Sequence, residues 1–185
     1  GVFRAARFKE RPREATGDQW TFVDNPFVGT RELSGLMILM TMVNNWDLRA
    51  DNTAVFPATG SDGVTELHYV VSDLGASFGR MEDVRFPQSI LSLLSWVNWD
   101  VHEYQQQRFI DGVHEGRLRL HFRGRLSMPE VPVEHARWFA GLVGQLTPEQ
   151  IRQAFEAAAA TPEQVDGFSA RFLAKVRKLR AAVSD

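Results

Sequence analysis

Residues 33–43 carry apolar side chains at helical spacing and on most of the other faces as well. The spaced positions are Leu33, Leu36, Met37, Met40 and Val43, and Ile38, Leu39 and Met42 fill the remaining faces. A helix that is apolar nearly all round is a buried one. The pattern therefore predicts a central core helix that begins after Thr30, a suitable N-cap, and ends at Asn44 and Asn45.

Two short apolar runs follow, residues 53–56 and 67–71, and a segment rich in turn-forming residues separates them. This order predicts a β-hairpin. Acidic turns flank it on both sides, residues 45–52 before the first strand and residues 72–75 after the second. Because an antiparallel hairpin brings its two ends together, we expect the two acidic turns to lie side by side.

The rest of the chain contains further strand and helix patterns. Residues 2–9 and 20–23 predict two short strands that could pair as a hairpin. Residues 90–99 predict a helix, which residues 100–110 could continue. Residues 117–126 alternate apolar and basic positions, which predicts a strand with one buried side.

Three helices are predicted near the C-terminus. The first covers residues 133–145, and the other two each begin with the sequence Thr-Pro-Glu-Gln, at Thr147 and Thr161. In both, the Thr oxygen can accept from a free amide, the Gln can reach back, and the Pro stands where an N–H would have no partner. Capping boxes therefore mark the start of the last two helices.

Composition adds limits on the function. The chain has 185 residues, 44% of them hydrophobic and 24% charged, which is typical of one globular domain of ordinary size. Its net charge of −2 gives no overall field for nucleic acid or for an anionic membrane. The absence of Cys excludes disulfides and thiolate metal sites, and no apolar run approaches the ~20 residues of a membrane span. The histidines are scattered and predict no zinc site.

Three oxygen-bearing side chains are predicted to converge at the acidic turns, those of Asp47, Asn52 and Asp73. Phosphoryl transfer needs a carboxylate near the attacking hydroxyl and oxygen ligands for a magnesium ion that bridges the phosphates. Mg²⁺ prefers hard oxygen ligands and takes one or two carboxylates from the protein. We therefore interpret Asp47 as the base or hydroxyl-orienting group, and Asn52 and Asp73 as metal ligands. Gly75 would let the chain bend sharply past the metal.

Two of these segments resemble known motifs. Residues 47–52, Asp-Leu-Arg-Ala-Asp-Asn, resemble the protein-kinase catalytic loop H-R-D-L-x-x-x-N, and residues 72–75, Ser-Asp-Leu-Gly, resemble the D-F-G metal-binding turn. The chain is similar also to atypical kinase-like branches such as the phosphatidylinositol kinases, whose loop keeps the Asp and the Asn but not the His-Arg. A closer resemblance, to a group of uncharacterised bacterial proteins, brings no established activity. It covers residues 25–33, 44–48, 71–79 and 109–114 and extends into the C-terminal helices.

The resemblance implies an α+β fold: a mostly helical kinase-like C-lobe with a catalytic-loop β-hairpin, and with the N-lobe largely absent from this chain. Residues 1–185 would form one such lobe. Residues 1–24 would be a remnant hairpin of the N-lobe side, residues 25–79 the catalytic core and residues 80–185 a helical subdomain. The cofactors implied are Mg²⁺ and ATP, which Asn52, Asp73 and Gly75 would hold, and the phosphate acceptor is not identified.

The sequence departs from the kinase pattern in several places. Asn45 and Trp46 replace His-Arg, and Leu74 replaces Phe. There is no Gly-rich loop, and no lysine stands on a strand with a glutamate partner on a helix; the lysines are Lys9, Lys175 and Lys178. We therefore expect that the nucleotide-covering N-lobe lies upstream of this chain or has been lost.

Other interpretations remain open. The protein could be a pseudokinase or a helical interaction module that keeps the fold without turnover. Asp47, Asn52 and residues 73–75 could be ordinary turn residues whose side chains satisfy local amides. A basic row could bind anions or RNA, or could be a solvated face beside acidic neighbours. Its members are Arg117, Arg119, His121, Arg123 and Arg125.

A hydrolase is a further alternative. The sequence Gly75-x-Ser77-x-Gly79 matches the nucleophile elbow, in which a strand leads into a tight turn and then a helix. A strand is predicted before Ser77, but residues 80–88 contain Pro87 and have no helical period. The series of βα units that builds the parallel sheet of such enzymes is also missing.

Overall fold

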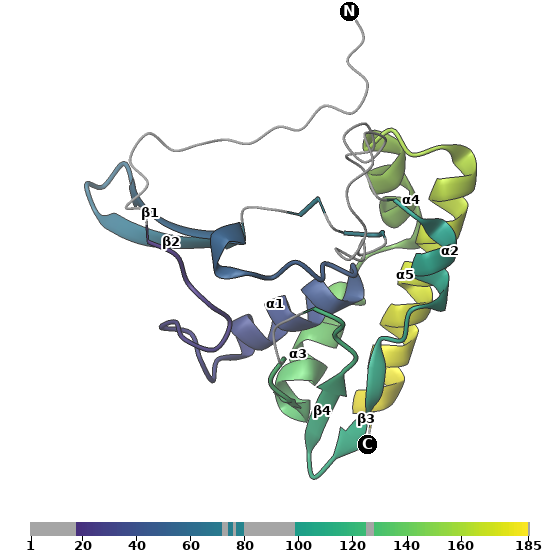
Figure 1. Ribbon diagram of the computed structural model, residues 1–185, viewed down its shortest axis with the longest axis horizontal. Helices are drawn as coiled ribbons and strands as arrows, with labels where there is room; N and C mark the ends of the chain where they lie inside the picture. Colours follow the sequence, from purple (N-terminus) through teal and green to yellow (C-terminus); the bar gives the residue numbers. More distant parts are fainter. Residues whose placement is uncertain (1–17, 72–73, 76, 80–98, 125–127, 185) are drawn as a thin grey trace, which may run out of the picture.

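The computed structural model of the protein describes residues 18–71, 74–75, 77–79, 99–124 and 128–184. This part of the chain holds five α-helices, a short 3₁₀ helix and two antiparallel sheets, so the protein is α+β (Figure 1). The elements are, in chain order, α1 (Arg31–Met42), η1 (Ala50–Asn52), β1 (Thr53–Thr59), β2 (Thr65–Val71), α2 (Val101–Gln106), β3 (Ile110–His114), β4 (Arg117–Leu120), β5 (Val131–Pro132), α3 (Val133–Val143), α4 (Pro148–Ala157) and α5 (Pro162–Val183).

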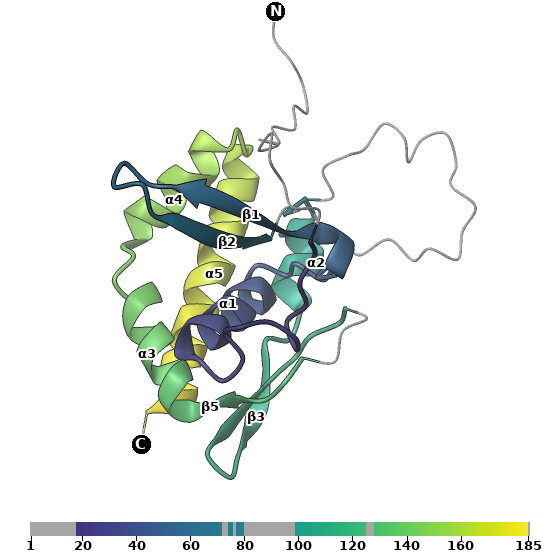
Figure 2. The same ribbon diagram turned by 90° about the vertical axis from the view of Figure 1, so that its left-hand side faces the viewer.

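Helix α1 begins where the sequence predicts. Thr30 Oγ1 caps it by accepting from the Leu33 N–H at 3.2 Å, and most of the helix is buried. The helix lies between the β1–β2 hairpin on one side and α3 on the other (Figures 1 and 2). Gly35 permits the close contact with α3, because a Cβ at this position would lie 2.9 Å from the Phe139 ring.

Strands β1 and β2 form the predicted hairpin and pair over their whole length. The Val55 N–H donates to the Asp18 carbonyl at 3.0 Å, so every second amide of β1 is directed away from β2. Pro57 takes one of these outward positions, where its missing N–H removes no bond between the strands. The hairpin projects from the helical body of the molecule (Figure 1).

The three C-terminal helices are confirmed. α4 and α5 both start with complete capping boxes, in which Thr147 and Thr161 pair with Gln150 and Gln164. α5 is 22 residues long and packs against α2, α3, α4 and β3. It thereby joins the helical side of the molecule into one core, to which α1 and the strands also contribute.

The strand expected at residues 20–23 is wrong. Thr21 and Asp24 instead exchange two backbone hydrogen bonds across a tight turn, at 3.4 and 3.3 Å. Trp20 and Phe22 enter the hydrophobic core, and the Trp20 N–H donates to the side chain of Thr53 rather than to a neighbouring strand. The aromatic pattern therefore reflected core packing and not a sheet. Residues 2–9, the other expected strand, lie outside the described residues.

Residues 100–110 do not form one helix. α2 stops at Gln106, and Ile110 opens strand β3, which the sequence analysis missed. A two-residue turn joins β3 to β4, with positive φ at Glu115 (49°) and Gly116 (72°), the geometry of a type I′ hairpin. The side-chain pattern of residues 100–110 resembled that of a polar helix. The tight turn at Glu115 and Gly116 instead pairs residues 110–114 with β4 as a strand.

One other expectation is met in part, and another lies almost entirely outside the described residues. β4 covers residues 117–120 of the strand expected at residues 117–126. Of the helix expected at residues 90–99, only Trp99 is described, and it forms a β-bridge with Gly79. None of the helices in the described part of the chain has the length and the apolar character that a membrane crossing requires.

Candidate functional site

Asp47 and Asn52 face each other across the turn between α1 and β1. Asn52 Nδ2 donates to the Asp47 main-chain oxygen at 2.9 Å and to the Asp47 carboxylate Oδ2 at 2.8 Å. The short helix η1 makes the turn tight enough for both contacts. The structure thus brings two of the three predicted site residues into direct contact.

The carboxylate of Asp47 also has a cationic partner. Arg49 Nε lies 3.0 Å from Asp47 Oδ1, and Arg49 Nη2 lies 3.0 Å from Asp51 Oδ2. The Asp47 side chain is still 37% exposed. An ion pair this exposed adds only ~0–1 kcal/mol to stability. Arg49 therefore orients the carboxylate and leaves it open to a second molecule.

The amide of Asn52 has a defined orientation because its nitrogen is bound to Asp47. Its oxygen, at the other end of the planar group, accepts no hydrogen bond from any residue that the structure describes. The residue as a whole is 9% exposed. An amide oxygen fixed in this way is a suitable ligand for a hard divalent cation.

The chain enters the acidic turn through buried residues. Asn44 follows α1 with a φ of 59°, and both Asn44 and Asn45 are fully buried. The side-chain oxygen of Asn45 accepts from the Asp47 N–H at 3.3 Å. Trp46 is buried edge-to-face against Phe122, with ring centroids 5.3 Å apart. The residues that replace the His-Arg of the kinase motif are therefore buried supports of this turn.

Phe78, three residues after Gly75, contacts the end of α1. The Phe78 N–H donates to the Val43 carbonyl at 2.7 Å, and the Phe78 carbonyl accepts from the Asp100 N–H at 3.2 Å. Phe78 has a φ of 60°, a left-handed conformation that these two bonds hold in place. Val71, the last residue of β2, lies opposite Thr53, the first residue of β1.

Asp73, the third member of the predicted site, lies outside the described residues. Gly75 is described and exposed. In the described ranges, no three His, Asp or Glu side chains are gathered as a metal site would require. The proximity of Asp73 to Asn52 stays a prediction.

A buried lysine that the sequence did not predict lies beside the turn. Lys175 of α5 is 1% exposed, and its Nζ donates to the Met42 carbonyl at 2.8 Å and to Asn44 Oδ1 at 2.6 Å. Tyr104 donates its hydroxyl to the same Met42 oxygen at 3.0 Å. Burial, followed by the nearby charge of Arg171, lowers the pKa of Lys175 to about 6. The start of the acidic turn thus depends on a residue 131 positions away in the chain.

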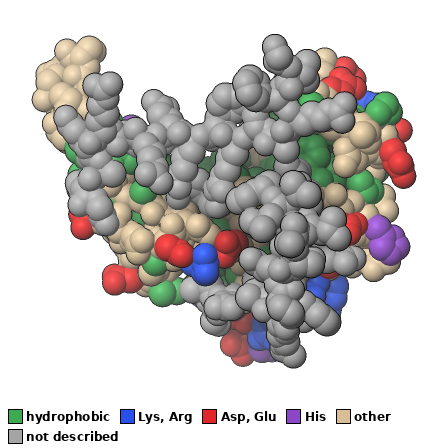
Figure 3. All heavy atoms as spheres, turned by 45° about the horizontal axis from the view of Figure 1, so that its top comes forward, with side chains coloured by type: hydrophobic (Ala, Val, Ile, Leu, Met, Phe, Trp, Pro, Cys, Tyr) green, Lys and Arg blue, Asp and Glu red, His purple; other side chains and the backbone are tan. Residues whose placement is uncertain are grey.

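The basic row on and after β4 is paired with acids. The pairs are Arg117 and Arg119 with Glu130, His121 with Asp111, and Arg123 with Glu103. Arg125 lies outside the described residues. On the face shown in Figure 3, charged side chains of both signs are interspersed. These observations favour a solvated, ion-paired face over an anion-binding patch.

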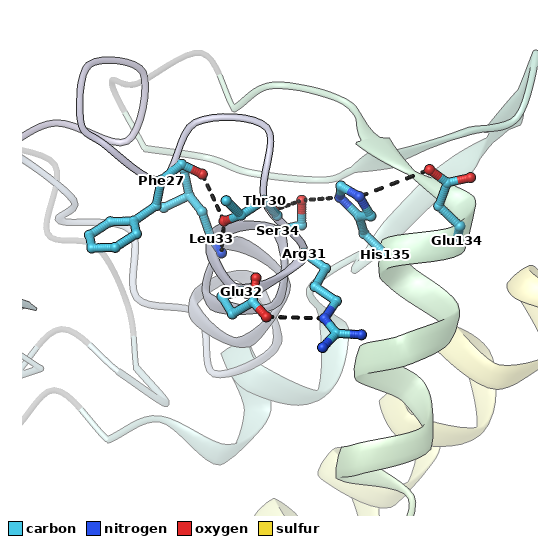
Figure 4. A network of polar contacts seen from close by, with 8 residues as sticks. All are labelled: Phe27, Thr30, Arg31, Glu32, Leu33, Ser34, Glu134 and His135. Atoms are coloured by element: carbon cyan, nitrogen blue, oxygen red, sulfur yellow. Dashed lines mark hydrogen bonds and ion pairs between the residues drawn. The ribbon is translucent and has the colours of Figure 1, made fainter.

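Ser34 and His135 form another polar pair, between α1 and α3 (Figure 4). Ser34 Oγ donates to the Thr30 carbonyl at 3.0 Å and lies 2.9 Å from His135 Nδ1, while His135 Nε2 lies 4.0 Å from Glu134. The Ser34 hydroxyl thus lies within hydrogen-bond distance of both a main-chain carbonyl and the imidazole, and the direction of its bond to His135 follows the tautomer of the ring. The pair therefore pins two helices together.

Among the described residues, Ser77 has no hydrogen-bond partner that would activate it. Its Oγ is buried and makes no hydrogen bond with the described residues. The strained backbone belongs to Phe78, one residue later, and not to the serine. The residues after Gly79, where a nucleophile elbow needs its helix, lie outside the described part of the chain. The hydrolase alternative gains no support here.

No family model, no curated protein sequence and no solved structure matches this chain. The function must therefore be inferred from the site itself. That site is a carboxylate with an amide partner and a cationic neighbour, at the foot of a hairpin and supported by buried residues from α1 and α5.

Proposed function

We propose that the protein is a phosphotransferase of kinase-like fold that uses ATP and Mg²⁺. The observation that carries the proposal is the contact between Asn52 Nδ2 and Asp47 Oδ2, at 2.8 Å. An Asp five residues before an Asn is common in sequences. A direct contact between the two, at the foot of a hairpin that leads to a second acidic turn, is a far more restrictive arrangement.

Asp47 is proposed to orient the acceptor hydroxyl and to take its proton. Asn52 binds one oxygen of its carboxylate and Arg49 binds the other, while the side chain stays partly exposed. A carboxylate oxygen has more than one lone pair, so each can still accept from a substrate hydroxyl. Proton transfer requires that hydroxyl to lie within ~2.6–3.2 Å of the carboxylate.

Asn52 and Asp73 are proposed as the ligands of Mg²⁺. Asn52 offers its amide oxygen, and Asp73 would add one carboxylate, a donor set that suits a hard cation. Val71, two residues before Asp73 in the chain, lies opposite Thr53, which follows Asn52. Two peptide units span at most ~8 Å, so a carboxylate at position 73 has the reach to meet the Asn52 amide. Bound Mg²⁺ would bridge phosphate oxygens and offset their charge.

The anchoring of the second turn supports this arrangement. The Phe78 N–H donates to the Val43 carbonyl. Asn44, which follows Val43 in the chain, leads directly into the first acidic turn. Gly75 stands between Asp73 and this anchor and is exposed. A residue without a side chain at this position would let the backbone pass close to the phosphates.

A second candidate is a protein of the same fold that binds nucleotide without turnover. One observation favours it: neither lysine in the described part of the chain pairs with a glutamate. Lys175 donates to the Met42 carbonyl and Lys178 donates to the Ile110 carbonyl. Both lysines therefore have structural partners and are not placed to hold a phosphate.

Consumption of ATP separates the two candidates. In the presence of Mg²⁺ and without an added acceptor, we expect the wild-type protein to transfer the γ-phosphoryl group slowly to water, and ³¹P NMR follows the ADP and inorganic phosphate that form. Asp47→Asn removes the proton acceptor and should lower the rate by ~100-fold or more, with the affinity for Mg·ATP retained. Asp51→Asn is the matched control, because Asp51 lies in the same turn and binds the same Arg49.

The control should keep the wild-type rate. Equal rates for Asp47→Asn and Asp51→Asn would contradict the role assigned to Asp47. Nucleotide binding with no consumption of ATP by the wild-type protein would support the second candidate instead.

A further inference from the structure

The amine of Lys175 connects the last helix to the entrance of the acidic turn. Its Nζ lies 2.8 Å from the carbonyl of Met42, at the end of α1, and 2.6 Å from Asn44 Oδ1. Asn44 is the left-handed residue, with a φ of 59°, three positions before Asp47. A single side chain thus reaches from α5 to the segment that sets the position of the proposed catalytic carboxylate.

The side chain of Asn44 depends on this contact. Its Oδ1 accepts from Lys175, and its Nδ2 is buried without a partner among the described residues. A left-handed conformation is uncommon for residues other than glycine and must be held by the surroundings. Lys175 is therefore the group that fixes the Asn44 side chain.

The surroundings of the amine contain no acid in the part of the chain that the structure describes. The groups that touch Nζ are the Met42 carbonyl, the Asn44 amide and the ring of Tyr104. The charged group that acts on it is Arg171 of the same helix, and burial raises the pKa of Tyr104, so the phenol stays neutral. Burial without a counter-charge brings the pKa of Lys175 down to about 6.

Gain of a proton changes what this amine can hold. A neutral amine has two N–H donors, whereas an ammonium has three and a full charge. The ammonium binds carbonyl oxygens at the C-terminal end of a helix more strongly, because the helix dipole places negative partial charge there. It is also attracted to the rings of Tyr104 and Phe109, whose centroids lie 4.1 and 5.8 Å away.

We propose that Lys175 is a positioning residue for the acidic turn. Protonation of its amine strengthens the hydrogen bond between α5 and Asn44 and thereby changes the position of Asp47. The link between Lys175 and the turn follows from the contacts alone. Only its effect on nucleotide binding rests on the function proposed above.

One other ionisable side chain lies near the same indole and must be separated from Lys175. His121, which contacts Asp111, precedes Phe122, and Trp46 of the acidic turn packs on Phe122. Substitutions at Lys175 and at His121 show which of the two residues causes a pH-dependent change at Trp46.

The indole N–H of Trp46 reports on the turn and can be followed by NMR. Spectra of the full chain, labelled with ¹⁵N and with ¹³C-lysine, would be recorded from about pH 5 to about pH 8. The Lys175 side-chain signal then gives its own titration in the same samples. The indole of Trp138 on α3 is the internal control. Lys175→Met keeps the length of the side chain without the amine, and His121→Gln removes the other ionisable group.

In the wild-type protein, the Trp46 signal should move with the same midpoint as the Lys175 signal, and the Trp138 signal should not. His121→Gln should keep this movement, and Lys175→Met should abolish it. If Lys175→Met does not fold, equal midpoints for Trp46 and Lys175, both in the wild type and in His121→Gln, carry the test. The proposal is overturned by a Trp46 signal that stays fixed while Lys175 titrates, by a movement that disappears in His121→Gln, or by a Lys175 signal with no midpoint in this range.

Binding of Mg·ATP at both ends of the pH range tests the consequence. The ratio of the two dissociation constants should differ between the wild type and Lys175→Met by about fivefold or more. Titration of the nucleotide itself is common to both proteins and cancels in this comparison. Equal ratios would refute the effect on the site. A wild-type protein that binds no Mg·ATP at either pH would count against the proposed function, and the indole titration would still decide the role of Lys175.

Discussion

At the scale of single residues, the candidate site depends on the two ends of the Asn52 amide. The nitrogen is bound to Asp47 by two hydrogen bonds, which leaves the oxygen to a ligand. The five-residue spacing predicted that these two side chains share a turn. It did not predict that Arg49 would bridge Asp47 to Asp51. The exposed Arg49 side chain has many rotamers, and the sequence does not show which of them is adopted.

The buried amine of Lys175 predicts how stability depends on pH. Its pKa in the folded protein is about 6, against an ordinary value of 10.5. Between these values the unfolded chain holds a proton that the folded protein has released, so the free energy of unfolding must rise with pH. The slope from this group is at most ~1.4 kcal/mol per pH unit, and it vanishes below the folded pKa and above the unfolded one.

Urea unfolding at about pH 6.5 and about pH 8.5 measures this slope. Lys175→Met removes the titrating group, so the gain in stability between the two pH values should be smaller in the variant than in the wild type. All other ionisable groups are the same in the two proteins, so their contributions largely cancel in the difference. An identical gain in the two proteins would show that Lys175 stays charged in the folded protein throughout this range.

At the scale of elements, the contact between α1 and α3 depends on a missing side chain. A Cβ at Gly35 would lie 2.9 Å from Phe139 Cδ2 and 3.1 Å from Trp138 Cζ3. The same two helices are pinned by the Ser34–His135 hydrogen bond, one position away along α1. Gly35 thus sets the spacing of the helices and Ser34 sets their register.

Two matched substitutions test this packing. Gly35→Ala should lower the free energy of unfolding by ~1–3 kcal/mol through overpacking, less a gain of up to ~1 kcal/mol from helix propensity. Gly141→Ala, in α3, keeps the propensity gain alone, because a Cβ there meets nothing within 4 Å. Thermal or urea unfolding of both variants gives the difference. Equal changes in the free energy of unfolding would mean that α1 and α3 move apart to accommodate the new methyl group without loss of stability.

The elements that the sequence predicted well are those fixed by local chemistry. Thr147 and Thr161 start helices because their capping boxes are complete within four residues. The expected strand at residues 20–23 failed because Trp20 and Phe22 pack into a core made by distant elements. Strand β3 was missed because its hairpin turn, Glu115 and Gly116, has no Asn or Asp to mark it.

At the scale of the whole molecule, three elements distant in sequence meet at the acidic turn. Asn52 stands at the end of η1, where the hairpin begins, α1 leads into Asn44, and α5 supplies Lys175. The helical spacing of Phe168, Phe172 and Leu179 places Lys175 on the buried stripe of α5, so its burial could be read from the sequence. Its contact with Asn44 could not be predicted, because no local sequence pattern relates two residues 131 positions apart.

The central claim is that Asn52 and Asp73 hold one divalent cation with its nucleotide, and calorimetric titration with Mg·ATP tests it most directly. The wild-type protein and Asp51→Asn should bind alike, because Asp51 is paired with Arg49 at the exposed edge of the turn and is not a proposed ligand. Asn52→Ala and Asp73→Ala should each weaken binding by ~10-fold or more, since each removes one of two protein ligands. Asp73→Ala with the affinity of Asp51→Asn would contradict the account.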